Sequence, residues 1–332
     1  MIKITAAITA VGKYVPDHVL TNEMLEKMVE TNDEWIVSRT GIKERRILKE
    51  PGKGTSFLAI KAAENLIAKT KLDPKNIELV IVATATQDMQ AASTAAFVAS
   101  QIGATEAFAF DLDSACSSFL YGMSAAARYI ESGKYKKVLL IGADMCSSMI
   151  DYTDRVTCII FGDGAGAVLF EPNTEGLGLQ DEYLRTDGNG REFLKVAAGG
   201  SLSRPSIETV NNRQHFIRQE GRTVFKFAVS NMADASEKIL KRNNLTNEDV
   251  TWLAPHQANK RIIEATANRM NLDMNKVMMN IHKYGNTTSA TLPLLISDYE
   301  DQLKKGDTII FAAFGGGFSW GAIYLKWAYN QQ

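Results

Sequence analysis

Residues 62–81 read AAENLIAKTKLDPKNIELVI, and residues 235–254 read ASEKILKRNNLTNEDVTWLA. The two stretches align without a gap, so that Leu72 meets Leu245 at a distance of 173 residues (245 − 72). Each copy starts with the periodicity of an amphipathic helix, continues through a polar turn and ends in a short apolar strand. These strands are too apolar to have one face in water, as is typical of a covered α/β sheet. The sequence therefore predicts one helix–strand unit that is used twice.

Later elements of the two halves also resemble each other. Residues 138–143 (VLLIGA) are similar to residues 308–313 (TIIFAA), and glycine-rich runs follow at 162–170 and 315–325. Between the halves, residues 171–176 (EPNTEG) have the turn chemistry of a connector. A chain of 332 residues is long enough for two such units. We therefore predict an α/β protein with an N-terminal half at residues 1–172 and a C-terminal half at 173–332.

The glycines at 162, 164 and 166 invite comparison with a dinucleotide-binding loop. Such a loop needs a strand before the glycines and a helix after them. Residues 167–172 instead continue as a strand and stop at Pro172. We expect these glycines to permit close backbone packing.

The composition limits the classes of partner. A formal net charge of -1 gives no excess of positive charge that would indicate binding to nucleic acid or to an anionic membrane surface. The N-terminus has no secretory pattern, and no apolar run approaches the roughly 20 residues that span a bilayer. Cys116, Cys146 and Cys158 lack metal-ligand spacing and leave at least one thiol unpaired. We expect a cytoplasmic protein without disulfides, zinc or another metal.

Cys116 is the candidate nucleophile. It follows Asp111-Leu112-Asp113-Ser114-Ala115, which reads as the end of a strand and a turn, and it precedes a run of small and apolar residues. We predict that it lies in the first turn of a buried helix, where the helix dipole lowers the pKa of the thiol and favours thiolate. A lone cysteine is more commonly a packed core residue, which is our interpretation of Cys146 and Cys158.

Two polar residues of the C-terminal half are candidate partners. His256 ends the repeated strand, where the first half has Ala83, and the carboxyl edge of a strand is where α/β sheets bind ligands. Asn286 follows a glycine and precedes a run that starts a helix, so on its own it also fits a helix cap. The remaining histidines have polar, loop-like surroundings and are expected at the surface: His18, His215 and His282.

The segments around Cys116, His256 and Asn286, together with residues 314–321 (FGGGFSWG), resemble the motifs of β-ketoacyl-acyl-carrier-protein synthase III. They occur in the same order and at nearly the same spacing. The resemblance covers essentially the whole chain and extends to residues 33–42 and to Asp154-Arg155. It implies the thiolase fold, a five-layered αβαβα arrangement that suits the two similar halves.

The resemblance implies an acyltransferase that starts fatty acid biosynthesis without a cofactor and acts as a homodimer. Cys116 would take an acyl group from acyl-coenzyme A. His256 and Asn286 would donate hydrogen bonds to the malonyl thioester of an acyl carrier protein while carbon dioxide leaves. The backbone amides of Cys116 and Gly316 would hold the second oxyanion, and a glycine at 316 would let the backbone approach closely.

The resemblance also implies three sets of binding residues, each of which has a plain surface or packing role as its alternative. Coenzyme A would contact Trp35, Arg39, Arg155 and Asn259, and the acidic carrier protein would meet Lys226 and Arg261. The acyl pocket would include Phe314. Members of the family place a phenylalanine upstream of the catalytic cysteine to close the partner subunit's pocket, and Ala91 is the match here, which favours a larger pocket.

Four alternatives remain. Elongating ketoacyl synthases also carry such a cysteine motif, but they use a second histidine where this chain has Asn286. A hydroxymethylglutaryl-coenzyme A synthase would need a glutamate that residues 84–87 (TATQ) do not offer. A condensing or acyl-transfer enzyme of specialised metabolism and a non-catalytic, acyl-binding partner subunit are the other two.

Overall fold

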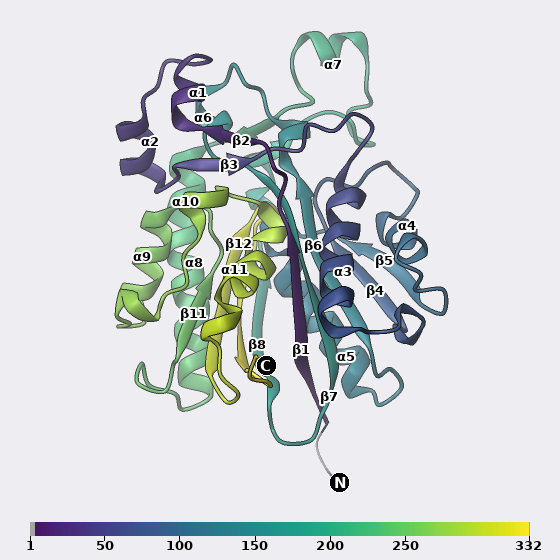
Figure 1. Ribbon diagram of the computed structural model, residues 1–332. Coiled ribbons are helices and arrows are strands. Elements are labelled where there is room, and N and C mark those ends of the chain that lie inside the picture. Colours follow the sequence, from purple (N-terminus) through teal and green to yellow (C-terminus); the bar gives the residue numbers. More distant parts are fainter. Residues whose placement is uncertain (1–3, 332) are drawn as a thin grey trace.

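Two β-sheets form the framework of residues 4–331, the part of the chain that this computed structural model describes (Figure 1). The first sheet has the strand order β1-β7-β6-β4-β5. Its parallel strands are β6, β4 and β5, of which β4 and β6 come from buried apolar runs, and β7 pairs antiparallel with both β6 and β1. The strands are β1 (Thr5–Tyr14), β4 (Leu79–Ala83), β5 (Phe108–Leu112), β6 (Val138–Met145) and β7 (Asp163–Asn173).

The second sheet has the order β11-β12-β13-β8 and repeats the pattern of the first. β11 pairs parallel with β12, and β13 pairs antiparallel with β12 and β8. A fifth strand is reduced to one parallel bridge between Leu253 and Val277, at the place that β5 takes in the first sheet. The strands are β8 (Gly178–Thr186), β11 (Trp252–Pro255), β12 (Thr308–Gly315) and β13 (Ser319–Lys326).

Helices cover both outer faces and fill the space between the sheets, which gives five layers (Figure 1). Three separate apolar clusters lie between these layers, and residues such as Phe119, Leu66 and Ile239 are fully buried in them. The αβαβα arrangement expected from the sequence is confirmed. The outer pairs are α3 (Thr55–Thr70) with α4 (Thr94–Gln101) and α8 (Gly221–Arg242) with α9 (Lys260–Arg269), and the central pair is α5 (Ser118–Glu131) with α11 (Thr291–Tyr299).

The internal repeat is a repeat of structure. The helix–strand unit of α3 and β4 returns as α8 and β11, and Leu79 and Trp252 begin their strands 173 residues apart (252 − 79). The central helices keep the same spacing, since α5 begins at Ser118 and α11 at Thr291 (291 − 118 = 173). The sheets separate between β7, which ends at Asn173, and β8, which begins at Gly178, so only Asn173 of the first sheet lies beyond the predicted boundary. The boundary between residues 172 and 173 remains our proposal for the domain division.

The glycine run of the first half packs as expected. Gly164 and Gly166 lie on β7, and no helix follows it. A Cβ atom on Gly166 would lie 2.6 Å from Cβ of Pro293 on α11, and one on Gly162 would lie 2.3 Å from the Tyr284 carbonyl oxygen. These glycines therefore allow close packing between the two halves.

A smaller group of elements lies over one end of the sheets, at the top of Figure 1. Its apolar side chains, which include Leu25, Ile36 and Ile42, form a fourth cluster with Ile281 of the C-terminal half. The group consists of β2 (Val19–Thr21), α1 (Asn22–Glu26), α2 (Asp33–Thr40), β3 (Glu44–Arg46), α6 (Arg155–Cys158), β9 (Leu194–Val196), α7 (Ile207–Asn211), β10 (Ile217–Gln219) and α10 (Ile281–Tyr284). The carboxyl ends of β4, β5, β6 and β11 point to this end, where the candidate residues gather.

Candidate active site

Cys116 lies on a turn between β5 and α5. The turn is a 3₁₀ element, Ala115–Ser117, and α5 begins two residues after the cysteine. The prediction that Cys116 belongs to the first turn of the helix is therefore wrong, because the helix begins two residues later. Ala115 adopts a φ of 50°, and its carbonyl oxygen accepts hydrogen bonds from the hydroxyl groups of Ser118 and Ser289. This strained residue turns the chain so that Cys116 stands at the helix entrance.

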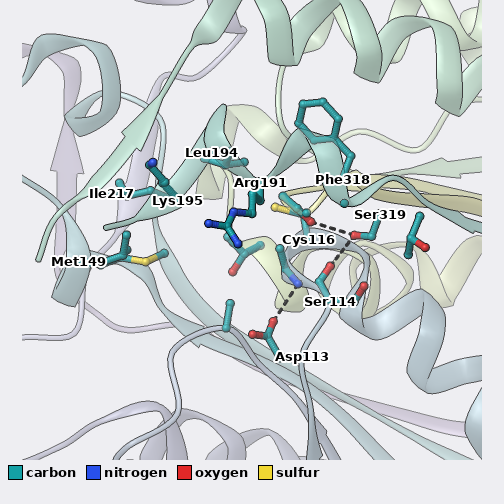
Figure 2. A pocket seen from close by; sticks show the side chains of 18 of the residues that line it. Asp113, Ser114, Cys116, Met149, Arg191, Leu194, Lys195, Ile217, Phe318 and Ser319 are labelled. Carbon is teal, nitrogen blue, oxygen red and sulfur yellow. Dashed lines mark hydrogen bonds between the residues drawn. The ribbon is translucent and has the colours of Figure 1, made fainter. Parts of the chain in front are cut away.

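Serine side chains fasten this turn to the C-terminal half. The Ser117 hydroxyl donates to the Ser319 carbonyl oxygen at 3.0 Å, and the Ser319 hydroxyl donates to the Ser114 carbonyl oxygen at 2.8 Å. Figure 2 shows Ser114 and Ser319 beside Cys116. Because Ser319 begins β13, these bonds hold the loop between β12 and β13 against the cysteine.

The glycine that approaches the cysteine most closely is Gly315. A Cβ atom there would lie 2.7 Å from the Cys116 backbone nitrogen and 3.0 Å from the Ser117 nitrogen. At Gly316 the nearest atom would be the Leu194 carbonyl oxygen at 3.4 Å. The expectation that position 316 needs glycine for close approach is therefore wrong, and Gly315 has that role. The backbone amide of Gly316 remains our predicted oxyanion donor.

His256 is the first residue after β11, as the sequence predicts. Its backbone N–H donates to the Ala312 carbonyl oxygen at 2.8 Å, which fixes it beside β12. The side chain is only 1% exposed, and neither ring nitrogen has a hydrogen-bond partner within residues 4–331. A buried imidazole with both nitrogens free is poised to bind a ligand.

Asn286 forms an isolated parallel bridge with Phe161, and its backbone N–H donates to the Ile160 carbonyl oxygen at 2.9 Å. Its Oδ1 accepts the Thr288 backbone N–H at 2.9 Å. The contact resembles capping, but the cap residues of the two following elements are Thr287 and Ala290, so Asn286 itself is not a helix cap. Because the oxygen is occupied, the Nδ2 donor is the group free to interact with Cys116, and the Asn286 side chain acts to lower the pKa of that thiol.

Two cavities meet at Cys116, and both also contact Phe161 and Leu194. The smaller, of about 170 Å³, contains His256 and Asn286 and extends toward α8 and α9. The larger, of about 620 Å³, lies on the other side of the thiol. In Figure 2, Met149, Ile217 and Lys195 lie across the larger cavity from Cys116. The nucleophile can thus be reached from two directions.

Burial controls the protonation of the site. It raises the pKa of the Cys116 thiol to about 12, and the Asp144 carboxylate adds to this, while the Cys116 backbone N–H and the Asn286 side chain act in the opposite direction. The prediction of a lowered thiol pKa is therefore wrong, because desolvation outweighs the effect of the helix terminus. Burial also lowers the pKa of His256 to about 3. Its imidazole is thus neutral near pH 7 and carries one N–H donor.

The residues predicted to contact coenzyme A form two groups around α2. The Arg155 guanidinium lies over the Trp35 ring, 5.0 Å from its centroid, so a planar cation and a planar ring already meet there. Asn259 caps α9 and donates from Nδ2 to the Arg39 carbonyl oxygen at 2.9 Å, while the Arg39 side chain is exposed. Asn259 also contacts the smaller cavity. Binding of coenzyme A by these four residues remains a prediction.

The predicted docking residues lie on α8 and α9, each next in sequence to a residue that lines the smaller cavity. Lys226 on α8 and Arg261 on α9 are both exposed, and the Arg261 guanidinium lies 5.3 Å from the centroid of the Phe225 ring, which contacts the smaller cavity. Phe314, predicted in the acyl pocket, lies in this smaller cavity with His256. Ala91 lies at neither cavity but in a separate hollow beside Phe110 and Asp111 of β5.

Two buried polar residues escaped the sequence interpretation. The Gln257 side chain accepts the backbone N–H groups of Asn280 and Ile281 and donates to the Pro255 carbonyl oxygen, so it ties the segment around His256 to the start of α10. Asp144, at the end of β6, accepts five hydrogen bonds from both halves. Its position at the carboxyl end of a predicted strand was the available signal.

Two kinds of feature are absent from residues 4–331. No helix there is long and apolar enough to cross a bilayer. No three His, Cys, Asp or Glu side chains in the same part of the chain are grouped as metal ligands would be.

Comparison with known proteins identifies the family. Residues 110–188 match the family model described as 3-oxoacyl-[acyl-carrier-protein (ACP)] synthase III, and residues 240–327 match the model of its C terminal part. The chain is 58% identical to β-ketoacyl-[acyl-carrier-protein] synthase III 2 of Bacteroides thetaiotaomicron over 330 residues, which cover 99% of this chain and 98% of that protein. It is 51% identical to the synthase III of Chlorobaculum tepidum, covering 97% and 99%.

Solved structures agree with this assignment. The 3-oxoacyl-[acyl-carrier-protein] synthase III of Aquifex aeolicus superimposes with a TM-score of 0.89 at 39% identity, covering 97% of this chain and all of that one. The Pseudomonas aeruginosa enzyme gives a TM-score of 0.89 at 34% identity and covers 99% of this chain. A chain with this fold and this similarity along its whole length belongs to the β-ketoacyl-[acyl-carrier-protein] synthase III family of thiolase-fold condensing enzymes.

Proposed function

We propose that this protein condenses an acyl group from acyl-coenzyme A with malonyl-acyl-carrier protein, with loss of carbon dioxide, to give 3-oxoacyl-acyl-carrier protein. This is the initiating condensation of fatty acid biosynthesis. The observation that carries the proposal is the position of Cys116 where two cavities meet, one of which holds His256 and Asn286. Relatives more than half identical along their whole length carry the synthase III name, which supports the same role.

The first half-reaction transfers the acyl group to the cysteine. The Cys116 sulfur attacks the thioester carbonyl, the bond to the coenzyme A sulfur breaks, and the thiol proton of Cys116 ends on the departing sulfur. No net proton is taken up, so a buried thiol with a raised pKa can react if the proton is passed within the site. The backbone amides of Cys116 and Gly316 are the proposed donors to the oxyanion formed in this step, and also to the oxyanion formed later when the enolate attacks the acyl-cysteine.

The second half-reaction uses His256 and Asn286 as hydrogen-bond donors. The malonyl thioester oxygen accepts from the neutral His256 imidazole and from Asn286 Nδ2 while the bond to the carboxylate breaks and carbon dioxide leaves. The resulting enolate carbon attacks the acyl carbonyl on Cys116, and the bond from that carbonyl to the cysteine sulfur breaks. The sulfur leaves as thiolate and takes up one proton from solvent, which is the proton that the overall condensation consumes. Each preorganised donor in such a buried site contributes about 3–4 kcal/mol to stabilising the developing charge.

The smaller cavity is the proposed entry for both thioesters. It leads from His256 to Phe225 and Ile262, beneath the exposed Lys226 and Arg261 on α8 and α9. Cationic side chains around an apolar mouth suit an acidic carrier protein that delivers a long thioester arm. Trp35 and Arg155 are the proposed contacts for the adenine of coenzyme A.

We also propose a homodimer. Strand β5 is the edge of the first sheet and is only partly buried, with Phe108 41% exposed. An exposed apolar edge strand favours pairing with a second strand, and a two-fold dimer would bring two β5 strands together. Ala91 and the exposed Met89 share a hollow with this strand, so a partner would cover them. Sedimentation of the wild type should give twice the chain mass, and a monomer at micromolar concentration would contradict this proposal.

The test of function separates the two half-reactions. Mass spectrometry follows acylation of the protein by acetyl-coenzyme A, and labelled carbon dioxide release follows decarboxylation of malonyl-acyl-carrier protein. We expect Cys116→Ala to abolish acylation, whereas the matched control Cys158→Ala, at a buried cysteine outside both cavities, should acylate normally. His256→Ala and Asn286→Ala should each reduce condensation by about 10²-fold or more and leave acylation largely intact.

The same assays separate the alternatives. A non-catalytic partner subunit would show no acylation of Cys116 by any thioester. An elongating synthase would accept acyl groups from acyl-carrier protein and ignore acyl-coenzyme A. Normal acylation of Cys116→Ala, or normal condensation by both His256→Ala and Asn286→Ala, would overturn the proposed mechanism.

A further inference from the structure

Asp144 is fully buried at the carboxyl end of β6 and stands between the two halves of the site. Its Oδ1 accepts hydrogen bonds from the N-terminal half: the Thr84 hydroxyl at 3.0 Å, the Ala85 N–H at 2.8 Å and the Thr86 hydroxyl at 2.8 Å. Its Oδ2 accepts from the C-terminal half: the Ser289 N–H at 2.8 Å and the Thr288 hydroxyl. One carboxylate thus joins segments that lie about 200 residues apart in the chain.

The two C-terminal donors lead directly to the reacting groups. The Thr288 backbone N–H holds Asn286 Oδ1 at 2.9 Å, which sets the direction of the Asn286 amide donor. The Ser289 hydroxyl donates to the Ala115 carbonyl oxygen at 3.3 Å, next to Cys116. Asp144 therefore reaches both Asn286 and the turn of Cys116 through a single short element, Thr288–Ala290.

From these contacts we infer that Asp144 is a positioning residue, which fixes the Asn286 amide donor for decarboxylation by clamping Thr288 and Ser289 to the first sheet. The inference rests on the proposed function, because it assigns Asn286 to the malonyl half-reaction. A displacement of about 1 Å at a site of this kind can cost about 10²-fold in rate.

Asparagine is the informative replacement at Asp144. It keeps the shape but replaces one acceptor oxygen with an NH₂ group, which would face either the Ala85 N–H or the Ser289 N–H. Hydroxyl groups can rotate to accept a hydrogen bond, but a backbone N–H cannot. The loss of charge also removes a repulsion that raises the pKa of Cys116, so the thiol should become easier to ionise.

The two effects have opposite signs, which distinguishes positioning from general damage. We expect Asp144→Asn to decarboxylate malonyl-acyl-carrier protein about 10- to 100-fold more slowly than wild type. Alkylation of Cys116 by iodoacetamide at pH 8 should be as fast as in wild type or faster. Removing the Asp144 charge should also shift the pH profile of alkylation to lower pH, whereas a protein that is merely loosened would be alkylated faster at every pH without that shift.

Asp163→Asn is the matched control. Asp163 is equally buried and accepts the Leu48 N–H at 2.8 Å and both the N–H and the hydroxyl of Ser147, all within the N-terminal half. It makes no hydrogen bond to the segment after Asn286, so its variant should lose stability but keep decarboxylation per folded molecule. Equal losses of decarboxylation in Asp144→Asn and Asp163→Asn would overturn the inference.

A second pair of variants applies if Asp144→Asn does not fold. Thr288→Val removes the hydroxyl group that donates a hydrogen bond to Asp144, whereas Thr288→Ser keeps it. We expect decarboxylation to fall in the valine variant and to recover in the serine variant. Equal rates in the two would contradict the clamp. A wild type that neither acylates Cys116 nor decarboxylates malonyl-acyl-carrier protein would overturn the proposed function, and the inference with it.

Discussion

Replacing Gly315 with alanine should damage the site far more than the same change at Gly316. The added Cβ at position 315 would lie 2.7 Å from the Cys116 backbone nitrogen, whereas ordinary contacts of a Cβ atom begin at 3.4 Å. The backbone must therefore move by about 0.7 Å (3.4 − 2.7), more than the roughly 0.5 Å within which a catalytic group has to be held. The atom that moves carries a proposed oxyanion donor, so activity and stability should both fall.

The expected size follows from two known effects. Misplacing one oxyanion donor costs about 10²- to 10³-fold in rate, and forcing an extra methyl group into a packed region costs about 1–3 kcal/mol of stability. At Gly316 the added atom would lie 3.4 Å from the Leu194 carbonyl oxygen, and alanine keeps the backbone N–H. Gly316→Ala should therefore lose much less of either quantity.

The assay is kcat/KM for condensation of acetyl-coenzyme A with malonyl-acyl-carrier protein, measured with the urea stability of each variant. Steady-state acylation of Cys116 should fall in parallel with condensation for Gly315→Ala, because the same amide is proposed to serve both oxyanions. If both alanine variants lost activity by the same factor, or if Gly315→Ala kept full activity, the proposed contact between Gly315 and the Cys116 amide would not control the oxyanion site.

Three further predictions concern protonation and the acyl pocket. Because burial raises the pKa of Cys116 to about 12, the rate of its alkylation by iodoacetamide should still increase with pH at pH 9. A plateau in that rate by pH 8 would show that the helix terminus outweighs desolvation. His256 has a pKa lowered to about 3 by burial, so below pH 6.5 the unfolded chain binds a proton that the folded protein does not, and stability falls as the pH falls toward 3. Urea titrations of wild type and His256→Gln should therefore converge on acidification, and parallel pH profiles would contradict the lowered pKa. Ala91→Phe should reduce kcat/KM for isobutyryl-, isovaleryl- and octanoyl-coenzyme A relative to acetyl-coenzyme A. The partner subunit's new aromatic ring would fill space that a longer acyl chain needs, and each methylene that is no longer buried loses about 0.8 kcal/mol of binding free energy. A wild type that strongly prefers acetyl-coenzyme A and is unchanged by the substitution would show that another residue closes the pocket.

Much of the architecture could be predicted from the sequence because the signals are local. Helical periodicity and short apolar strands recur within the two copies at 62–81 and 235–254, and α3, β4, α8 and β11 follow them in the structure. The same reasoning placed Cys116 after β5 and His256 after β11, since a residue next to a strand stays next to it in the fold. The family motifs added Asn286, which local patterns alone did not distinguish from a helix cap.

The chemistry of the site was decided by tertiary structure. The pKa shifts of Cys116 and His256 arise from burial by many segments, so their size and, for the thiol, their direction could not follow from neighbouring residues. The sequence does not distinguish Gly315 from Gly316, whereas in the fold only a Cβ atom at position 315 would collide with the Cys116 amide. Asp144 gains its role because sheet pairing and the packing of the two halves bring residues 84–86 and 288–289 to one carboxylate. The sequence determined which helices and strands form and which residues follow the ends of the strands. The distances, the burial and the hydrogen-bond partners of those residues depend on contacts between segments that lie far apart in the chain.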